Sequence, residues 1–167
     1  AQLMDRKPDF LASTKQVLHG TTLVINAVLE RKGAKTALIT TEGFRDVLEI
    51  GTERRYDLYD LQQQYPEPLV PRYLRRGVTE RLRSDGATLV PLDKAEVDRI
   101  AADFASDGVE AVAVCLLHAY QNPVHELAIR ERLTKMLPDA SVSLSSEVLP
   151  EINEYARTST TVVNAYT

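Results

Sequence analysis

Four consecutive residues near the start of the chain, His19-Gly20-Thr21-Thr22, are of types that can bind an oxyanion or carry a proton. They follow a short apolar run and precede a helix predicted from about Leu23 to Lys32. The first turn of such a helix has free backbone N–H groups and the positive end of the helix dipole, which attract a carboxylate or phosphate. We therefore expect this turn to bind a substrate anion, with His19 as hydrogen-bond donor or proton carrier. The alternative is that Thr21 or Thr22 only caps the helix and His19 has a supporting role.

A second polar segment, from Arg54 to Asp60, combines guanidinium, phenol and carboxylate groups. Arg54 and Arg55 are suited to bidentate binding of a carboxylate or phosphate. The segment belongs to a stretch without periodicity, from Thr52 to Pro71, and such long loops are often functional or lie at an interface. A solvated or subunit-facing loop whose charges pair with one another explains the same composition, and both interpretations stay open.

His118 follows the most apolar run of the chain, Val109–Leu117. Ligands of open α/β sheets bind at the carboxyl edge of the strands, so we expect His118 to line a cleft. His125, at the start of the next predicted helix, is expected to be a surface or capping group. The histidine spacing matches no common zinc pattern, so no metal held by these histidines is expected. Cys115 lies inside the apolar run and is predicted to be buried and unreactive.

Other catalytic signatures are absent from the sequence. It has no G-x-S-x-G elbow, no G-x-x-x-x-G-K-[ST] loop and no G-x-G-x-x-G fingerprint. The hydroxyl-rich stretch Arg157–Thr161 is interpreted as part of a helix whose hydroxyls bond back to the backbone or pack at an interface.

Composition limits the classes of partner. With 167 residues, 44% hydrophobic and 26% charged, the chain is typical of a globular protein. The net charge of -4 gives no reason to expect nucleic acid or a membrane as partner, and no apolar run reaches the roughly 20 residues of a bilayer span. A single cysteine fits a cytoplasmic location.

Helical periodicity alternates with short apolar runs, which is typical of an α/β fold. The predicted elements are a helix ending at Gly33, a strand over Lys35–Thr41, a hairpin of Val78–Arg83 and Ala87–Pro91 around Ser84-Asp85-Gly86, a helix from Asp93 to Gly108, a strand over Val109–Leu117, a helix from Asn122-Pro123 to Pro138, a strand over Ser141–Ser145, and a last helix from Pro150 towards Tyr166. The stretch Val47–Gly51 fits either a strand or a helical turn.

Four blocks of sequence, in order, carry a family resemblance. They are His19–Gly33, Thr36–Gly51, Val112–Glu126, and Leu144–Pro150 running on to Asn164–Tyr166. Together they resemble the amino-terminal domain of the hydantoinase/oxoprolinase A family, which includes hydantoinase A, 5-oxoprolinase, and the acetone and acetophenone carboxylase subunits. The resemblance spans nearly the whole chain.

The resemblance implies part of an actin-like ATPase domain, in which two α/β domains close over a nucleotide. It implies ATP and Mg²⁺ as cofactors, and a phosphorylated oxygen intermediate formed by positioning and charge neutralisation. The activity implied is ATP-coupled hydrolysis of a hydantoin or 5-oxoproline, with ketone carboxylation as an alternative and a non-catalytic subunit interface as another. A hydantoinase B-type partner is also implied. His19 to Thr22 fall on the family's motif beside the cleft.

The family's Asp-x-Gly-Gly-Thr phosphate loop and its second domain are not in this sequence. We therefore expect residues 1–167 to be a partial amino-terminal domain that is inactive towards ATP by itself.

Overall fold

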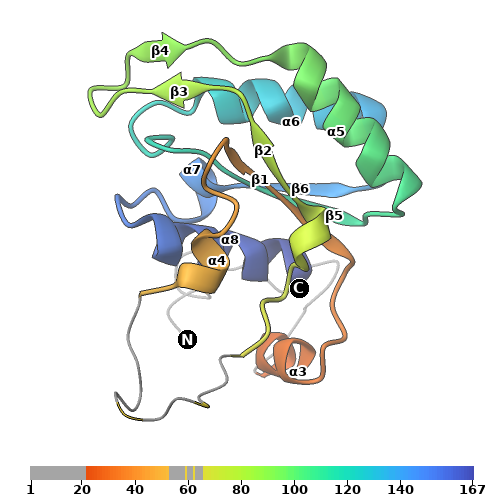
Figure 1. The fold of residues 1–167 in the computed structure, drawn as a ribbon. Coiled ribbons are helices and arrows are strands. Elements are labelled where there is room, and N and C mark those ends of the chain that lie inside the picture. Colours follow the sequence, from red (N-terminus) through yellow and green to blue (C-terminus); the bar gives the residue numbers. More distant parts are fainter. Residues whose placement is uncertain (1–21, 53–58, 60–61, 63–65) are drawn as a thin grey trace, which may run out of the picture.

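A parallel four-stranded sheet forms the centre of the computed structural model, which describes residues 22–52, 59, 62 and 66–167 (Figure 1). The strand order is β2-β1-β5-β6, and every neighbouring pair is parallel. The strands are β1 (Thr36–Thr41), β2 (Arg75–Val78), β5 (Ala111–Cys115) and β6 (Ser141–Leu144). Helices α5 (Lys94–Ser106) and α6 (Val124–Met136) cover one face, and α8 (Glu154–Tyr166) covers the other (Figure 1).

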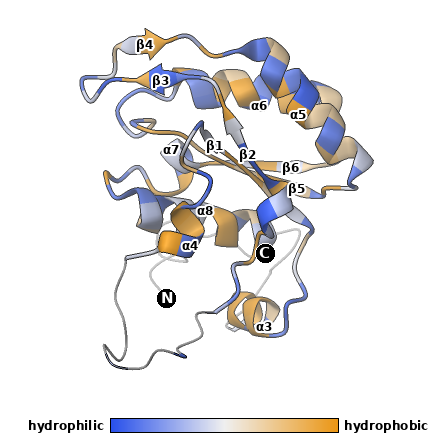
Figure 2. Cartoon of the chain, in the orientation of Figure 1, coloured by the Kyte–Doolittle hydropathy of each residue, from blue (hydrophilic) through white to orange (hydrophobic). Residues whose placement is uncertain are grey.

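The two central strands are buried along their whole length. All residues of β1 and β5 are buried, as expected for strands with both faces covered by helices. Hydrophobic residues are concentrated in these strands and on the helix faces turned towards them (Figure 2). The predicted strands Lys35–Thr41 and Val109–Leu117 are thereby confirmed, with slightly shorter bounds.

Helix α5 begins directly after Asp93, which is its N-cap residue. The Asp93 carboxylate accepts hydrogen bonds from the N–H groups of Ala95 and Glu96, which satisfies two free donors of the first turn. The Glu96 carboxylate does not return to the Asp93 N–H, as a capping box requires. It accepts instead from the N–H of Thr79, at 2.6 Å, and so ties the helix to the segment after β2.

The predicted hairpin is present, but its first strand is shorter than expected. Strands β3 (Arg81–Leu82) and β4 (Thr88–Val90) are antiparallel around Ser84-Asp85-Gly86. Val78 instead ends β2, where it pairs with Thr41 of β1. Strand β2 was missed because its sequence Arg-Arg-Gly-Val is polar.

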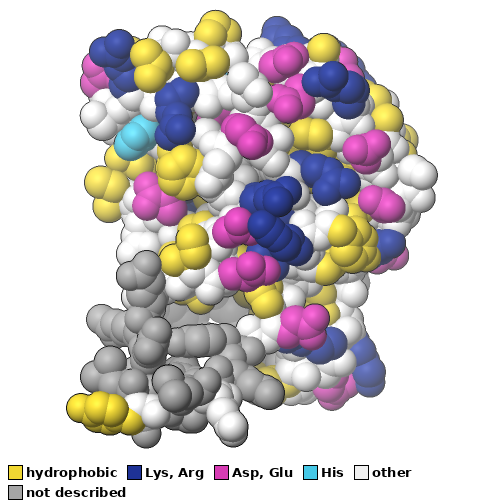
Figure 3. Space-filling view, in the orientation of Figure 1, with side chains coloured by type: hydrophobic (Ala, Val, Ile, Leu, Met, Phe, Trp, Pro, Cys, Tyr) yellow, Lys and Arg dark blue, Asp and Glu magenta, His cyan; other side chains and the backbone are white. Residues whose placement is uncertain are grey.

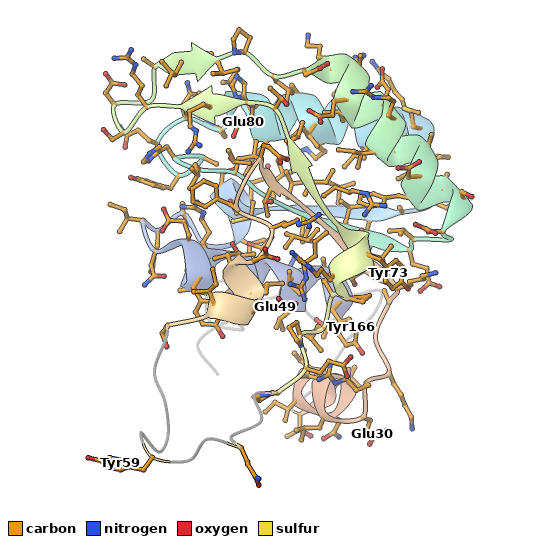
Figure 4. The ribbon with its side chains drawn as sticks, viewed as in Figure 1. Glu30, Glu49, Tyr59, Tyr73, Glu80 and Tyr166 are labelled. Carbon is orange, nitrogen blue, oxygen red and sulfur yellow. The ribbon has the colours of Figure 1, made fainter. Side chains whose placement is uncertain are left out.

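The contacts of a buried arginine explain how the polar strand β2 can be part of the sheet. Arg75 is 1% exposed, and its Nε donates to the carbonyl of Val70 at 2.9 Å. Its Nη1 lies 3.1 Å from Glu49 Oε1, in ion-pair contact without hydrogen-bond geometry. Glu49, the acidic partner of Arg75, is labelled in Figure 4.

Helix α3 (Leu23–Leu29) ends earlier than predicted. Its C-cap residue is Glu30, and Arg31 takes a left-handed conformation, with φ of 54°. Gly33 has a different role, because it packs against Tyr166 at the end of α8 so closely that a Cβ would lie 2.2 Å from the ring. None of the α3 side chains is buried.

Three short elements complete the described chain. The undecided stretch after β1 is the helical turn α4 (Val47–Ile50), and η1 (Arg72–Leu74) leads into β2. Helix α7 (Ser145–Val148) follows β6 directly, so Ser145 begins a helix and not the end of the predicted strand. In the described residues no helix has both the length and the apolarity to cross a membrane.

Candidate functional site at the carboxyl edge of the sheet

The structure describes only part of the predicted site. His19, Gly20, Thr21, Arg54 and Arg55 lie outside the described residues.

Thr22 precedes α3 at the N-cap position, but its side chain makes no capping hydrogen bond. Its backbone lies outside the extended region that capping residues usually adopt, with φ of -117° and ψ of 12°. Thr22 therefore does not cap α3 through its side chain. The other expected cap, Thr21, lies outside the described residues.

His118 lies where it was predicted, after β5 at the carboxyl edge of the sheet. We call Leu116–Gln121 the post-β5 turn. His118 has φ of 57°, a left-handed conformation that is costly for a residue with a Cβ. Its side chain is half-buried, and its Nδ1 atom is buried without a hydrogen-bond partner. The expected position of His118 in a cleft and its contact with a ligand stay predictions.

Leu116, the first residue of the post-β5 turn, is held from both sides. Its N–H donates to Glu126 Oε1 at 3.0 Å, and its carbonyl accepts from Arg157 Nη2 at 2.8 Å. Glu126 is fully buried, and its carboxylate also accepts from the Ser145 hydroxyl and from the N–H and hydroxyl of Ser146, at 2.6–2.9 Å. These donors offset the cost of burying a carboxylate.

Arg157 contacts both the backbone and a side chain of the post-β5 turn. It is 1% exposed and donates through Nη1 to the carbonyl of Glu151 at 2.7 Å. Its guanidinium lies 5.4 Å from the centre of the Tyr120 ring, which in turn meets the His118 ring edge-on at 6.1 Å. Arg157 Nε has no partner and, with the unpartnered hydroxyl of Thr40, belongs to residues lining a cavity of about 10 Å³. That volume has room for about one water.

A second buried chain of contacts reaches Leu117. Its N–H donates to Thr41 Oγ1 at 3.0 Å, and the Thr41 hydroxyl donates to the Glu80 carboxylate. The other Glu80 oxygen lies 2.7 Å from His125 Nδ1. Glu80 and His125 are only 4% and 7% exposed, so the predicted surface or capping role of His125 is wrong. The first turn of α6 faces Glu80, which lies where β2 runs into β3 (Figure 4).

Cys115 is buried, as predicted. Burial raises the pKa of its thiol above the usual value of 9.0, while the Arg157 charge and a hydrogen bond from Thr158 oppose that rise. The thiol is therefore neutral near pH 7 and unsuited to be a nucleophile. The hydroxyls of Ser159 and Thr161 donate to backbone carbonyls one turn earlier, which confirms that interpretation of the hydroxyl-rich stretch.

The described residues do not by themselves fit Mg²⁺ and ATP. Across residues 22–52 and 66–167, no three His, Cys, Asp or Glu side chains are grouped as metal ligands. On the face in Figure 3, basic and acidic side chains are interspersed, without a broad basic surface for a triphosphate. The arrangement that is present can position one histidine and orient the backbone of a turn.

Comparison with known proteins places this geometry in context. Residues 2–137 match the family described as the hydantoinase/oxoprolinase N-terminal region. The chain is 39% identical to the caprolactamase subunit alpha of Pseudomonas jessenii over 169 residues, which covers 99% of this chain. It is 34% identical to 5-oxoprolinase 1 of Arabidopsis thaliana over 88% of the chain, and 32% identical to the acetone carboxylase beta subunit of Xanthobacter autotrophicus over 93%.

Solved structures agree with the sequence matches. The crystal structure of the ATP-dependent caprolactamase from Pseudomonas jessenii superimposes with a TM-score of 0.83 at 38% identity, over 99% of this chain. A nucleotide-free acetone carboxylase superimposes with a TM-score of 0.79 at 30% identity, over 86% of the chain. These matches confirm the expected α/β, actin-like class. This chain spans only 24% of the caprolactamase subunit and 13% of the plant 5-oxoprolinase.

Proposed function

Because this chain belongs to the hydantoinase/oxoprolinase family, we propose that the full-length protein couples ATP hydrolysis to the opening of a cyclic amide. The similarity to a caprolactamase subunit over 99% of the chain supports this proposal most directly, since caprolactam and 5-oxoproline are both lactams. The relatives named acetone and acetophenone carboxylase subunits favour ketone carboxylation as the second candidate.

In this proposal the site residues contact the substrate or a transferred phosphate. His19 donates a hydrogen bond or carries a proton, and Gly20, Thr21 and Thr22 supply N–H groups and hydroxyls to an anion. His118 reaches the same ligand from the post-β5 turn, because ligands of open α/β sheets lie outside the carboxyl ends of the strands. ATP supplies the phosphoryl group when it binds to the full-length protein, with Mg²⁺ neutralising its charge.

A partner subunit and a cytoplasmic location belong to the same proposal. Relatives carry the names alpha, beta and gamma subunit, which supports assembly with other chains, and we propose a hydantoinase B-type partner. The single cysteine supports a reducing compartment.

The deciding experiment is substrate-dependent ATP consumption by the full-length protein with its partner subunit. Hydantoin, 5-oxoproline and ε-caprolactam form one arm, and acetone or acetophenone with bicarbonate forms the other. ADP release with a ring-opened product is the expected result. ADP release only with a ketone and bicarbonate would favour the carboxylase instead. Consumption that no substrate of either arm changes would overturn both proposals.

Substitution of Arg54 or Arg55 tests whether the Arg54–Asp60 segment binds the substrate or a partner subunit. If they bind a substrate anion, Arg55→Ala lowers turnover by about tenfold to a hundredfold, since a hydrogen bond to a charged group contributes about 1.5–3 kcal/mol. If Arg55 lies at the surface, the melting temperature should stay the same, because an ion pair on a protein surface adds about 0–1 kcal/mol. Full activity of the variant together with loss of the partner in size-exclusion chromatography would identify an interface.

A further inference from the structure

Two buried charged side chains form hydrogen bonds to the backbone of the same residue, Leu116. The N–H of Leu116 is bound by Glu126 from α6, and its carbonyl is bound by Arg157 from α8. Glu126 is 0% exposed and Arg157 is 1% exposed. Neutral side chains can satisfy a backbone N–H or carbonyl without the desolvation cost of a full charge. The charges therefore need an explanation beyond hydrogen-bond satisfaction.

Neither charge is neutralised by a contacting partner of opposite sign. Arg157 donates to two backbone carbonyls, and among the described residues no carboxylate forms an ion pair with it. Glu126 accepts only from backbone N–H groups and serine hydroxyls. Both side chains therefore depend on the backbone around Leu116 for a hydrogen-bond partner.

Arg157 is connected to the His118 ring through the ring of Tyr120. Its guanidinium lies over the Tyr120 ring at 5.4 Å, and the Tyr120 ring meets the His118 ring at 6.1 Å. The left-handed backbone of His118 persists only if the surrounding structure enforces it. The buried Leu116 contacts and the Tyr120 ring act on both sides of that strained position.

We propose that Glu126 and Arg157 are positioning residues that fix the post-β5 turn so that His118 faces the ligand of the sheet edge. This inference rests on the proposed function, in which His118 contacts the substrate or a transferred phosphate. Thr41 supports the same turn through the N–H of Leu117. In this inference Glu126 and Arg157 act through His118.

A double-mutant cycle in the full-length enzyme tests the coupling. Glu126→Gln keeps the size of the side chain but replaces one acceptor oxygen by an NH₂ group, so the side chain can no longer accept from both the N–H of Leu116 and the N–H of Ser146. We expect it to lower kcat about tenfold with 5-oxoproline or ε-caprolactam, whichever the enzyme turns over, and to leave KM within about twofold. In a His118→Ala background, Glu126→Gln should lower kcat by less than about twofold, since the group it positions is gone.

A second variant keeps the test valid if Glu126→Gln fails to fold. Tyr120→Leu removes the ring between Arg157 and His118 without removing a buried charge, and it should show the same loss of effect in the His118→Ala background. The matched control is Arg132→Gln, which breaks a half-buried ion pair between α6 and Asp98 of α5, away from the post-β5 turn, and should leave kcat unchanged in both backgrounds.

The possible results separate this inference from the function on which it rests. If the Tyr120→Leu and His118→Ala effects multiply fully, the positioning inference is wrong although His118 still matters. If His118→Ala retains full kcat and KM in an enzyme that opens lactams, the role of His118 and this inference both fail while the lactamase function stands. If no lactam or hydantoin is turned over, the proposed function fails, and with it the basis of the inference.

Discussion

Gly33 shows how one atom can decide a contact between two elements. A Cβ at this position would lie 2.2 Å from the Tyr166 ring and 2.4 Å from the Tyr166 carbonyl oxygen. That carbonyl is fixed because it accepts from the N–H of Ala34 at 2.9 Å. We predict that Gly33→Ala lowers the free energy of unfolding by about 1–3 kcal/mol, measured by urea denaturation.

Gly77→Ala is the matched comparison for this prediction. Its shortest contact would be with the carboxylate end of Glu42, an exposed side chain that can move away, and the only backbone atom among its three nearest neighbours is the Glu42 Cα at 3.0 Å. The loss of stability should therefore be smaller than for Gly33→Ala. Equal losses in the two variants would mean that the Tyr166 contact does not restrict position 33.

Cys115 gives the chain a stability that depends on pH. Burial raises the pKa of the folded thiol above 9.0, so the folded chain keeps a proton that the unfolded chain releases. This contribution is complete below about pH 9, the pKa of the unfolded thiol, and is lost as pH rises through the folded pKa. We predict that the free energy of unfolding falls more steeply from pH 9 to pH 10 than it does in Cys115→Ala. Parallel curves for the two proteins would contradict the prediction.

The sequence predicted the position of a single residue in the fold only where that residue belonged to a local pattern. Cys115 and His118 could be located because they belong to, or follow, one continuous apolar run. Glu80 and Glu126 could not, because periodicity does not show which distant groups a side chain will meet. His125 was wrongly expected at the surface for the same reason, since its partner Glu80 is 45 positions away.

Helix α5 offers a test at the scale of an element. Its first turn relies on the Asp93 carboxylate, which accepts from two N–H groups. We predict that Asp93→Ala lowers the free energy of unfolding by about 1 kcal/mol, measured by urea denaturation. Asp103→Ala, an exposed change in the same helix, should be nearly neutral, and an equal effect in both variants would argue against the cap.

Elements were predictable when their own composition determined them. Strands β1 and β5 and helices α5, α6 and α8 were predicted because apolar spacing, capping residues and prolines agreed. Strand β2 was missed because Arg75 becomes buried only through its tertiary contacts with Val70 and Glu49. Helix α3 was predicted too long because the left-handed residue after it is Arg31, where glycine is the usual signal.

At the scale of the molecule, the sequence predicted the fold class and the family but not a nucleotide site. The fold class followed from the alternation of helices and strands, and the family followed from four blocks of residues. Residue spacing could not identify a nucleotide site, because actin-like ATPases form that site between two domains. This chain spans about a quarter of the caprolactamase subunit.

We therefore predict that the isolated 167-residue chain hydrolyses no ATP above background in the presence of Mg²⁺, whereas the full-length protein with its partner does so in response to substrate. The physical reason is that phosphoryl transfer depends on positioning and on charge neutralisation around the phosphates. Among the described residues, no three His, Cys, Asp or Glu side chains lie together as ligands for Mg²⁺, and the sequence has no glycine-rich phosphate loop.

The measurement is ADP release by the purified chain, whose folding is verified by circular dichroism and a cooperative thermal transition. Robust, Mg²⁺-dependent turnover by this chain would show that it contains a complete nucleotide site, and would move the search for that site to residues 1–21 and 53–65.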